Sequence, residues 1–390
     1  MYGVESKRWS EPSGHSSRVG TVPIATVPMG RGHRVSRRLQ NVDRGTMRKQ
    51  GDGSELRSEV TLKDIARETG LSVNTVSRAL RGKADISAET TKRVVEVAKR
   101  MGYTRNALAS QLRTRESGIL GLVIADMANP VYSGVAKGVE AVAKREGYCV
   151  LVSDTEENPD KEELAINMML EKRVDGLLIV PTQQRHDAII QLRERGYPFV
   201  LVGREYSDFA ANCVVNDDTR GGYLATEYLL SKGHCRIAFI GGRPYISSTA
   251  KRVEGYRRAL AVKGIEFDPG VVIWSEPSME GGYAAVRELL MRSKRDWTAV
   301  FCFSDLVAAG VMLALRESGL DIPRDVAVVG YDDIEFAPVL YPPLTTVDIC
   351  KYRMGERGAE MLINYLRANP ASRMLKEVIL EPKLVVRDSA

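Results

Sequence analysis

The sequence predicts a two-lobed α/β body, each lobe built on a parallel sheet, preceded by a small all-helical unit. From residue 118 onward, runs of Val, Ile and Leu alternate with amphipathic stretches, as expected for parallel strands covered by helices on both faces. Residues 60–102 instead hold three short helical stretches punctuated by Gly. The 390 residues are enough for two or three compact units.

The first segment, residues 1–57, is rich in Gly, Ser, Pro and Arg and shows no apolar period. We expect it to be a disordered basic extension. One interpretation is an arm that adds nonspecific phosphate contacts. The favoured alternative is an early start codon, in which case residues 1–46 are not part of the protein and Met47 is the true start.

Charge is distributed unevenly along the chain. Residues 1–113 hold 22 Lys and Arg against 11 Asp and Glu, whereas residues 114–390 hold 34 against 39. A basic head on a mildly acidic body indicates an anionic polymer as the partner of the head. No stretch of 18 apolar residues and no secretory apolar region is present, so we expect a cytoplasmic protein that does not enter the membrane.

The cysteines and histidines give no sign of a metal site. The five cysteines show no CxxC spacing and lie mostly within apolar runs, and the four histidines share no ligand spacing. We expect reduced core thiols, no bound metal and no cofactor. The cysteines are Cys149, Cys213, Cys235, Cys302 and Cys350.

The helical unit, residues 58–104, has clear start and stop signals. Thr61 followed by Asp64 resembles a capping box, and Gly70 ends the first helix. Ser72 then caps a second helix after a very short turn, and Ser87 opens a third. Two helices joined by a tight turn are typical of a helix-turn-helix.

The second helix has an unusual outer face. Val76, Ala79 and Leu80 form its inward side, which leaves short polar residues and one arginine outside. Such a helix can enter the major groove, where Asn pairs with adenine, Arg with guanine, and Val meets the thymine methyl. The alternative is a solvated helix of an ordinary bundle. The predicted DNA contacts are Thr61, Ser72, Val73, Asn74, Thr75, Ser77 and Arg78.

Residues 105–117 follow as a short connecting segment. Asn106 can cap a helix whose Leu108 and Leu112 lie four residues apart. So brief a helix is marginal in water, and we expect it to form only on DNA. An ordinary tether is the alternative, more plausible for residues 114–117.

In the body, polar residues follow the predicted strands. Ligands of open parallel sheets bind beyond the carboxyl ends of the strands, so these residues are expected to converge on one cleft. They are Asp126, Asn129, Asp154, Arg204, Trp274 and Asp305. Asp126 and Asp154 could instead cap helices. The Asp332–Asp333 pair is interpreted as a brace for the hinge strands.

The stretch "VTLKDIARETGLSVNTVSRAL", the following "ISAETTKRVVEVAKRMGYTRNALASQL" and the later "PPLTTV" closely resemble the LacI-type (LacI/GalR) family of bacterial transcription regulators. The resemblance covers about residues 60–388. It implies a periplasmic-binding-protein-like body with three crossovers. The lobes would comprise 118–215 with 333–347, and 217–331 with 350–390.

The resemblance also implies residue roles. Asn106, Ala109 and Leu112 would belong to a hinge helix that enters the minor groove, with Leu112 as the wedge. The implied ligand-binding residues are Tyr132, Arg204, Arg252, Trp274, Asp305 and Phe336. Ser304 and Gly203 depart from the usual family pattern, which leaves the identity of the ligand open.

The function implied is that of a homodimeric repressor, released from a pseudo-palindromic operator by a sugar or sugar-like effector. A corepressor-dependent regulator is the second choice. A free-standing solute receptor shares the two-lobed body, but residues 60–113 argue against it. An enzyme is disfavoured because the sequence shows no nucleophile–base set, P-loop or GxGxxG.

Overall fold

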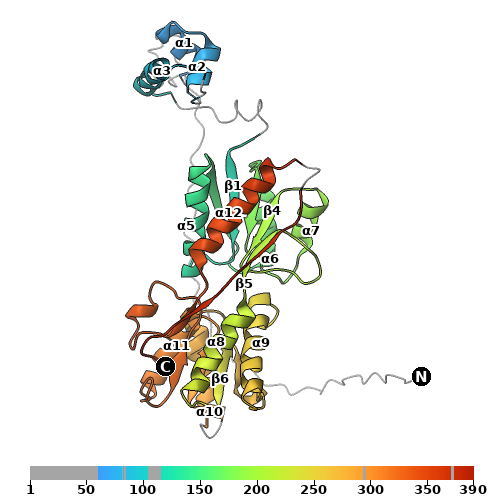
Figure 1. Ribbon diagram of the computed structural model, residues 1–390, viewed down its shortest axis with the longest axis vertical. Coiled ribbons are helices and arrows are strands. Elements are labelled where there is room, and N and C mark those ends of the chain that lie inside the picture. The colour runs from blue at the N-terminus through green and yellow to red at the C-terminus, as the bar shows by residue number, and fades with distance from the viewer. Residues whose placement is uncertain (1–59, 81, 83–84, 104–115, 293–295, 370–372) are drawn as a thin grey trace, which may run out of the picture. The chain divides into compact units, whose positions relative to one another are not determined.

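The computed structural model of this protein describes residues 60–80, 82, 85–103, 116–292, 296–369 and 373–390. The chain divides into two compact units, residues 1–103 and 104–390, which are considered separately below (Figure 1). The predicted basic extension and the hinge residues Asn106, Ala109 and Leu112 lie outside the described residues.

The first unit, called the headpiece below, has the three predicted helices α1 (Leu62–Thr69), α2 (Val73–Ala79) and α3 (Ala88–Arg100). The capping box is confirmed, since the Thr61 backbone N–H donates to Asp64 Oδ2 at 3.0 Å. Gly70 ends α1 in the left-handed conformation at φ 69°. Ser72 and Ser87 accept the backbone N–H three residues on. The shared core is Ile65, Ala66, Val76, Ala79, Val94 and Ala98.

The N-lobe of the body is a six-stranded parallel sheet in the order β11-β5-β4-β3-β1-β2. Helices α5 (Pro130–Arg145) and α12 (Lys351–Arg367) bury their apolar stripes in one core cluster, and α6 (Pro159–Glu171) and α7 (Asp187–Glu194) bury theirs in another. The strands are β1 (Ile119–Ile124), β2 (Cys149–Asp154), β3 (Gly176–Ile179), β4 (Phe199–Val202), β5 (Cys213–Asn216) and β11 (Glu377–Leu380).

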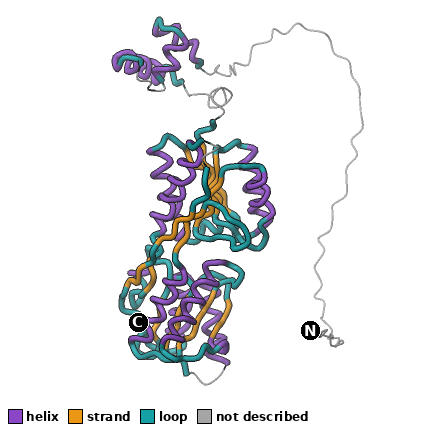
Figure 2. Tube along the Cα trace, turned by 45° about the vertical axis from the view of Figure 1, so that its right-hand side comes forward, coloured by secondary structure: helices purple, strands orange, loops and turns teal. Residues whose placement is uncertain are grey.

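The C-lobe has a four-stranded parallel sheet in the order β7-β6-β8-β9, and strands lie between helices in both lobes (Figure 2). Its strands are β6 (Ile237–Gly241), β7 (Val272–Trp274), β8 (Ala299–Cys302) and β9 (Ala327–Val329). Its helices are α8 (Asp218–Ser231), α9 (Ser247–Val262), α10 (Met279–Arg292) and α11 (Asp305–Glu317), with the short 3₁₀ turns η1 (Pro269–Val271) and η2 (Ala337–Val339). The predicted fold class is confirmed.

The chain passes between the lobes three times, but the assignment of the C-terminal segments to lobes was wrong. Residues 333–347 belong to the C-lobe, because Ile334, Ala337 and Leu344 lie in its core cluster. Helix α12 and strand β11 belong to the N-lobe, since α12 packs on α5 and β11 pairs with β5. The chain then returns to the C-lobe, where β12 (Lys383–Val385) pairs antiparallel with β10 (Thr346–Asp348).

Neighbouring helices of the body pack so closely at certain glycines that backbone contacts backbone. A Cβ added at Gly138 of α5 would lie 2.1 Å from the Tyr352 carbonyl oxygen of α12. At Gly222 of α8 it would lie 2.2 Å from the Arg252 carbonyl oxygen of α9. Glycine is therefore required at both positions, and the close packing makes each helix pair stiff.

The N-lobe begins at a fixed point. The Asp175 carboxylate accepts the backbone N–H groups of Ser117 and Gly118, each at 2.7 Å. Two hydrogen bonds to one carboxylate tie the start of β1 to the turn before β3. The first described residues of the body therefore move with its N-lobe sheet.

The expectation of core thiols is wrong for two of the five cysteines. Cys149 and Cys235 are exposed, one at the start of the edge strand β2 and one in the turn before β6. Cys213 and Cys302 are buried, and Cys350 is half-buried. Among the described residues, no helix is both long and apolar enough to cross a membrane.

Candidate functional site

A cleft lies between the two lobes of the body, beyond the carboxyl ends of β1, β4, β5, β8 and β9. Its lining combines polar groups with Phe303 and aliphatic side chains. The polar lining residues are Asp126, Asn129, Tyr132, Glu157, Arg204, Asn216, Ser248, Arg252 and Asp332. The free space at its centre is about 70 Å³, room for only a few water molecules.

Arg204 is the buried cation on the N-lobe side. Its Nη1 donates to Glu157 Oε2 at 2.9 Å and its Nη2 to Glu157 Oε1 at 2.5 Å. The same guanidinium donates to the Pro181 carbonyl at 2.8 Å and the Tyr132 hydroxyl at 3.2 Å. Burial alone lowers the pKa of Arg204, but the opposing charges of its partners outweigh burial and raise it. The group stays charged, and both of its terminal nitrogens are hydrogen-bonded.

Arg252 is the corresponding cation on the C-lobe side. Its Nε donates to Asp218 Oδ1 at 2.9 Å and its Nη1 to the Phe303 carbonyl at 2.7 Å. The guanidinium lies 3.7 Å from the centre of the Tyr331 ring. Each residue of the Arg252–Asp218 pair is about 5 % exposed or less, so removing either would leave an uncompensated charge.

Asp332 is a cleft residue, although its place at the end of a strand indicated only a cap or brace. It lines the cavity, and its Oδ1 lies 3.5 Å from Arg252 Nη1. Burial raises the pKa of Asp332 to about 7, against the attraction of Arg252. Its backbone is strained at φ 110°. The rule for parallel strands, applied to the end of β9, would have found it.

The neighbouring Asp333 does act as a brace. Its carboxylate pairs with Arg387 at 2.7 Å, and Lys351 Nζ donates to its backbone carbonyl. Lys351 belongs to the N-lobe helix α12, and Asp333 lies in the C-lobe. The second crossing between the lobes is thus held from both sides.

The structure brings together Tyr132, Arg204 and Arg252, but it does not place the other three predicted ligand residues at the cavity lining. Trp274 is 47 % exposed and packs edge-on against Phe239. Phe336 is 57 % exposed and directly precedes η2.

Asp305, the third of these, is fully buried at the start of α11. Its carboxylate accepts the Thr346 hydroxyl at 2.5 Å and the Ile334 N–H at 2.8 Å. Burial raises the pKa of Asp305 to about 8. Its contacts are structural: they hold the chain at the second crossing.

Asp154 is likewise absent from the cavity lining. Its carboxylate accepts the Met127 N–H at 3.1 Å and the Glu156 N–H at 3.0 Å. It therefore supports the loops that carry Asp126 and Glu157, and it caps neither neighbouring helix, because the N-caps of α5 and α6 are Asn129 and Asn158.

Hydrogen bonds across the rim hold the two lobes together. Gln184 Nε2 donates to the Tyr245 hydroxyl at 2.8 Å, and the Ser247 N–H donates to Gln183 Oε1 at 2.9 Å. On another side, Lys137 lies 3.5 Å from Glu335. Ligand pockets usually hold about 300–1,000 Å³, so admitting a sugar requires some of these contacts to break.

The headpiece presents a second candidate surface. Val73 and Asn74 are exposed at the first turn of α2, and Thr75, Ser77 and Arg78 are half-buried. The Arg78 guanidinium forms an ion pair with Asp85. A nucleic acid base would have to replace Asp85 as the partner of Arg78. The exposed face is small and polar enough to enter a major groove.

Comparisons with known proteins match both units. Residues 61–106 match the family model described as "Bacterial regulatory proteins, lacI family", and residues 117–382 match "Periplasmic binding proteins and sugar binding domain of LacI family". The chain is 34 % identical over 329 residues to the ribose operon repressor of Haemophilus influenzae, covering 84 % of this chain and 98 % of the relative.

Solved structures show the same similarity. The transcriptional regulator CelR–cellobiose complex aligns with a TM-score of 0.66 at 32 % identity, covering 85 % of this chain and all of that one. The lac repressor dimer bound to operator and an anti-inducer aligns with a TM-score of 0.75 at 26 % identity, covering 85 % of this chain and 99 % of that one.

Proposed function

Because the chain belongs to the lacI family of bacterial regulatory proteins, we propose that it is a repressor released from its operator by a sugar or sugar-like effector. The observation that carries the effector class is the cleft, whose lining holds two buried guanidinium groups and several carboxylates. Such groups form paired hydrogen bonds with adjacent hydroxyls. Relatives named for ribose and cellobiose support the same chemistry.

The proposed ligand residues are those that converge. Arg204 and Tyr132 hold the ligand from the N-lobe, and Arg252 with Asp332 hold it from the C-lobe. Asp126 and Asn129 complete the polar wall. Trp274, Asp305 and Phe336 remain predictions that require the lobes or loops to move before they reach the ligand.

The proposed switch is a change in lobe orientation. An effector that binds one orientation more tightly shifts the population toward it, by no more than its difference in affinity. Because the Asp175 carboxylate ties residues 117–118 to the N-lobe, the start of the connecting segment follows that change. In a dimer, the spacing of the two connecting segments would then decide whether both headpieces can bind one operator.

The headpiece residues proposed to contact DNA are unchanged from the sequence analysis, and a homodimer on a pseudo-palindromic site is the proposed assembly. Binding to chromosomal DNA implies action in the cytoplasm. A solute receptor would have no use for the headpiece. The named relatives are regulators, and we infer no enzymatic activity.

The test has two stages on the full-length protein. A panel of sugars, polyols and sugar acids is screened by thermal shift, because a ligand bound only by the native state raises the melting temperature. Duplexes selected from a random pool are then titrated with and without the best ligand. Release from a two-fold symmetric duplex is expected. Lack of any preferred duplex at low salt, or tighter binding with the ligand, would contradict the proposed mode of repression.

A further inference from the structure

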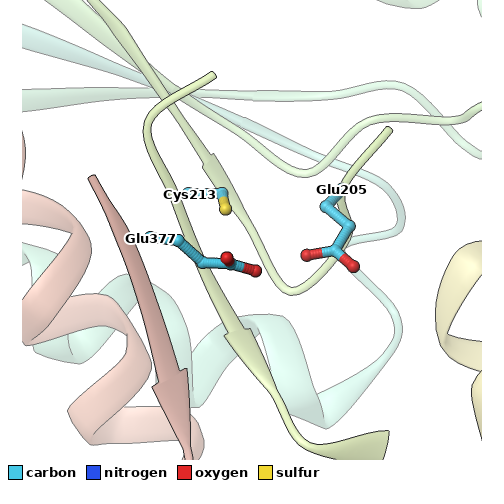
Figure 3. Close-up of side chains that lie close together, drawn as sticks. All are labelled: Glu205, Cys213 and Glu377. Carbon is cyan, nitrogen blue, oxygen red and sulfur yellow. The ribbon is translucent and has the colours of Figure 1, made fainter. Parts of the chain in front are cut away.

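We propose that Glu205, Cys213 and Glu377 form a binding site for a divalent metal ion of the zinc type, separate from the effector cleft. Their ligand atoms all lie within 4.8 Å of one another. Figure 3 shows the two carboxylates and the thiol directed toward a common space. Glu205 and Cys213 are eight residues apart, but Glu377 follows 164 residues after Cys213, which is why ligand spacing gave no sign of the cluster.

The fold explains the convergence. Cys213 begins β5 and Glu377 begins β11, and the two are direct neighbours in this parallel pair. Side chains of paired residues in parallel strands stand on the same face of the sheet. Glu205 follows β4, the strand on the other side of β5, and so reaches the same face from the opposite direction.

A second observation points to a ligand. The three residues line a surface hollow with about 350 Å³ of free space, whose wall includes the stacked rings of Tyr206 and Phe209. Cys213 is only 6 % exposed, and its thiol makes no hydrogen bond among the residues that the structure describes. A buried thiol without a hydrogen bond, directed into a hollow beside two carboxylates, has the donor atoms of a metal-binding site.

The electrostatics of the cluster agree with this geometry. The ligand oxygens of Glu205 and Glu377 lie within 4.8 Å of each other, so the two ionised carboxylates repel one another. A divalent cation would relieve this repulsion between the carboxylates. On binding, the Cys213 thiol releases its proton to solvent as the metal–sulfur bond forms.

A thiolate with two carboxylates favours zinc over magnesium or calcium, which prefer oxygen ligands alone. Zinc–ligand bonds of about 2.0–2.3 Å place tetrahedral ligands roughly 3.5 Å apart. The ligand atoms would therefore have to approach one another by about 1 Å. Rotation about the side-chain torsions of Glu377 and Glu205 would supply this adjustment, once Glu205 leaves its ion pair with Lys251. Water would fill the fourth position.

One residue competes with the metal. Lys251 of the C-lobe helix α9 forms an ion pair with Glu205. A metal ion would take the same carboxylate and would be repelled by the ammonium. Metal binding and this contact between the lobes are therefore mutually exclusive.

The test uses chelator-treated full-length protein titrated with Co²⁺, which reports a metal–thiolate bond by charge-transfer absorption. We expect one saturable band per chain that Zn²⁺ abolishes. Cys213→Ser should remove the band, and Glu377→Gln should weaken binding by about tenfold or more. Cys235→Ser, at an exposed cysteine, is the matched control and should bind as the unchanged protein does.

Lys251→Met supplies a test that misfolding cannot mimic, because it should tighten Co²⁺ binding. Circular dichroism checks that each variant is folded. Absence of a saturable band, a band that persists in Cys213→Ser, or weaker binding in folded Lys251→Met would overturn the proposal. The result does not depend on the identity of the effector or the operator.

Discussion

Arg204 and Glu157 are joined by two parallel hydrogen bonds inside the cleft, one from each terminal nitrogen of the guanidinium. The side chains of both residues are about nine-tenths buried. A ligand that uses Arg204 must therefore displace Glu157 or share the arginine with it. Glu157 thus occupies the hydrogen-bond donors of Arg204 that a ligand would use.

This relationship predicts opposite effects of two substitutions. Arg204→Ala should weaken effector binding by about tenfold or more, because a hydrogen bond to a charged group contributes about 1.5–3 kcal/mol. Glu157→Gln should tighten it, because the competing charge is gone while one acceptor remains. Titration calorimetry measures both, with Arg258→Ala on the exposed face of α9 as control. Weaker binding in Glu157→Gln would show that Glu157 itself holds the ligand.

The raised pKa of Asp305 predicts how stability depends on pH. Its pKa is about 8 in the folded protein and near 3.8 when unfolded, so the native state holds the extra proton between these values. Stability linked to this group is complete below about pH 4 and is lost as pH rises to about 8. The free energy of unfolding, measured by urea denaturation, should therefore fall less steeply with pH in Asp305→Asn than in the unchanged protein. The expected difference in slope is about 1.4 kcal/mol per pH unit.

The comparison between the two proteins reports on Asp305 together with Asp332, because the like charge of Asp332 also raises the pKa of Asp305; the remaining titrating groups are shared. Measurements at pH 5, 6 and 7 on both would suffice. The same pH dependence in Asp305→Asn as in the unchanged protein would show that Asp305 is ionised in the native state.

The close approach of α8 and α9 predicts a defect at Gly222. Gly222→Ala forces a Cβ to within 2.2 Å of the Arg252 carbonyl unless the helices separate. We expect a loss of about 1–3 kcal/mol in the free energy of unfolding and weaker effector binding, since α9 carries Arg252. Ala261→Ser, on the exposed side of α9, is the control. Unchanged stability in Gly222→Ala would show that the helix pair can slide apart freely.

In the headpiece, two substitutions should separate base contacts from phosphate contacts. Asn74→Ala should relax the preference at one base pair, with a difference of about 1–3 kcal/mol. Lys63→Ala, at an exposed position of α1, should leave the base preference intact. It should reduce the steepness with which the logarithm of the DNA-binding constant falls with the logarithm of salt concentration, by about one unit. Binding to a set of single-base variants at several salt concentrations measures both. The reverse pattern would mean that α1, not α2, enters the groove.

Leu112 lies outside the described residues, and its role as a wedge remains a prediction. Leu112→Ala should weaken specific binding far more than nonspecific binding, because the leucine is inserted into an unstacked base step only in the specific complex. Fluorescence anisotropy with operator and random duplexes measures the two affinities. Equal losses on both duplexes would rule out the wedge.

Local signals in the sequence sufficed for the headpiece and the strands. The Thr61–Asp64 box and the Ser72 and Ser87 caps depend on residues three apart, and the strands on continuous apolar runs. The ends of the first and fourth predicted strands gave Asp126, Asn129 and Arg204 as cleft residues for the same reason.

Distant pairing could not be predicted in this way. Nothing local distinguishes α12, which packs on α5 more than 200 residues earlier, from a helix of the C-lobe. Glu157 appeared as an ordinary loop residue, because its partner Arg204 is 47 positions away. Asp332 and Asp333 were given the same role because they are adjacent in sequence. In the structure Asp332 lines the cleft, whereas Asp333 pairs with Arg387.

The Asp175 carboxylate fixes residues 117–118 to the sheet of the N-lobe by two hydrogen bonds. A tilt of that lobe consequently carries residues 117–118 with it. Fluorescent labels placed near this point in each subunit would therefore act as a gauge of lobe orientation, readable in solution without any DNA present.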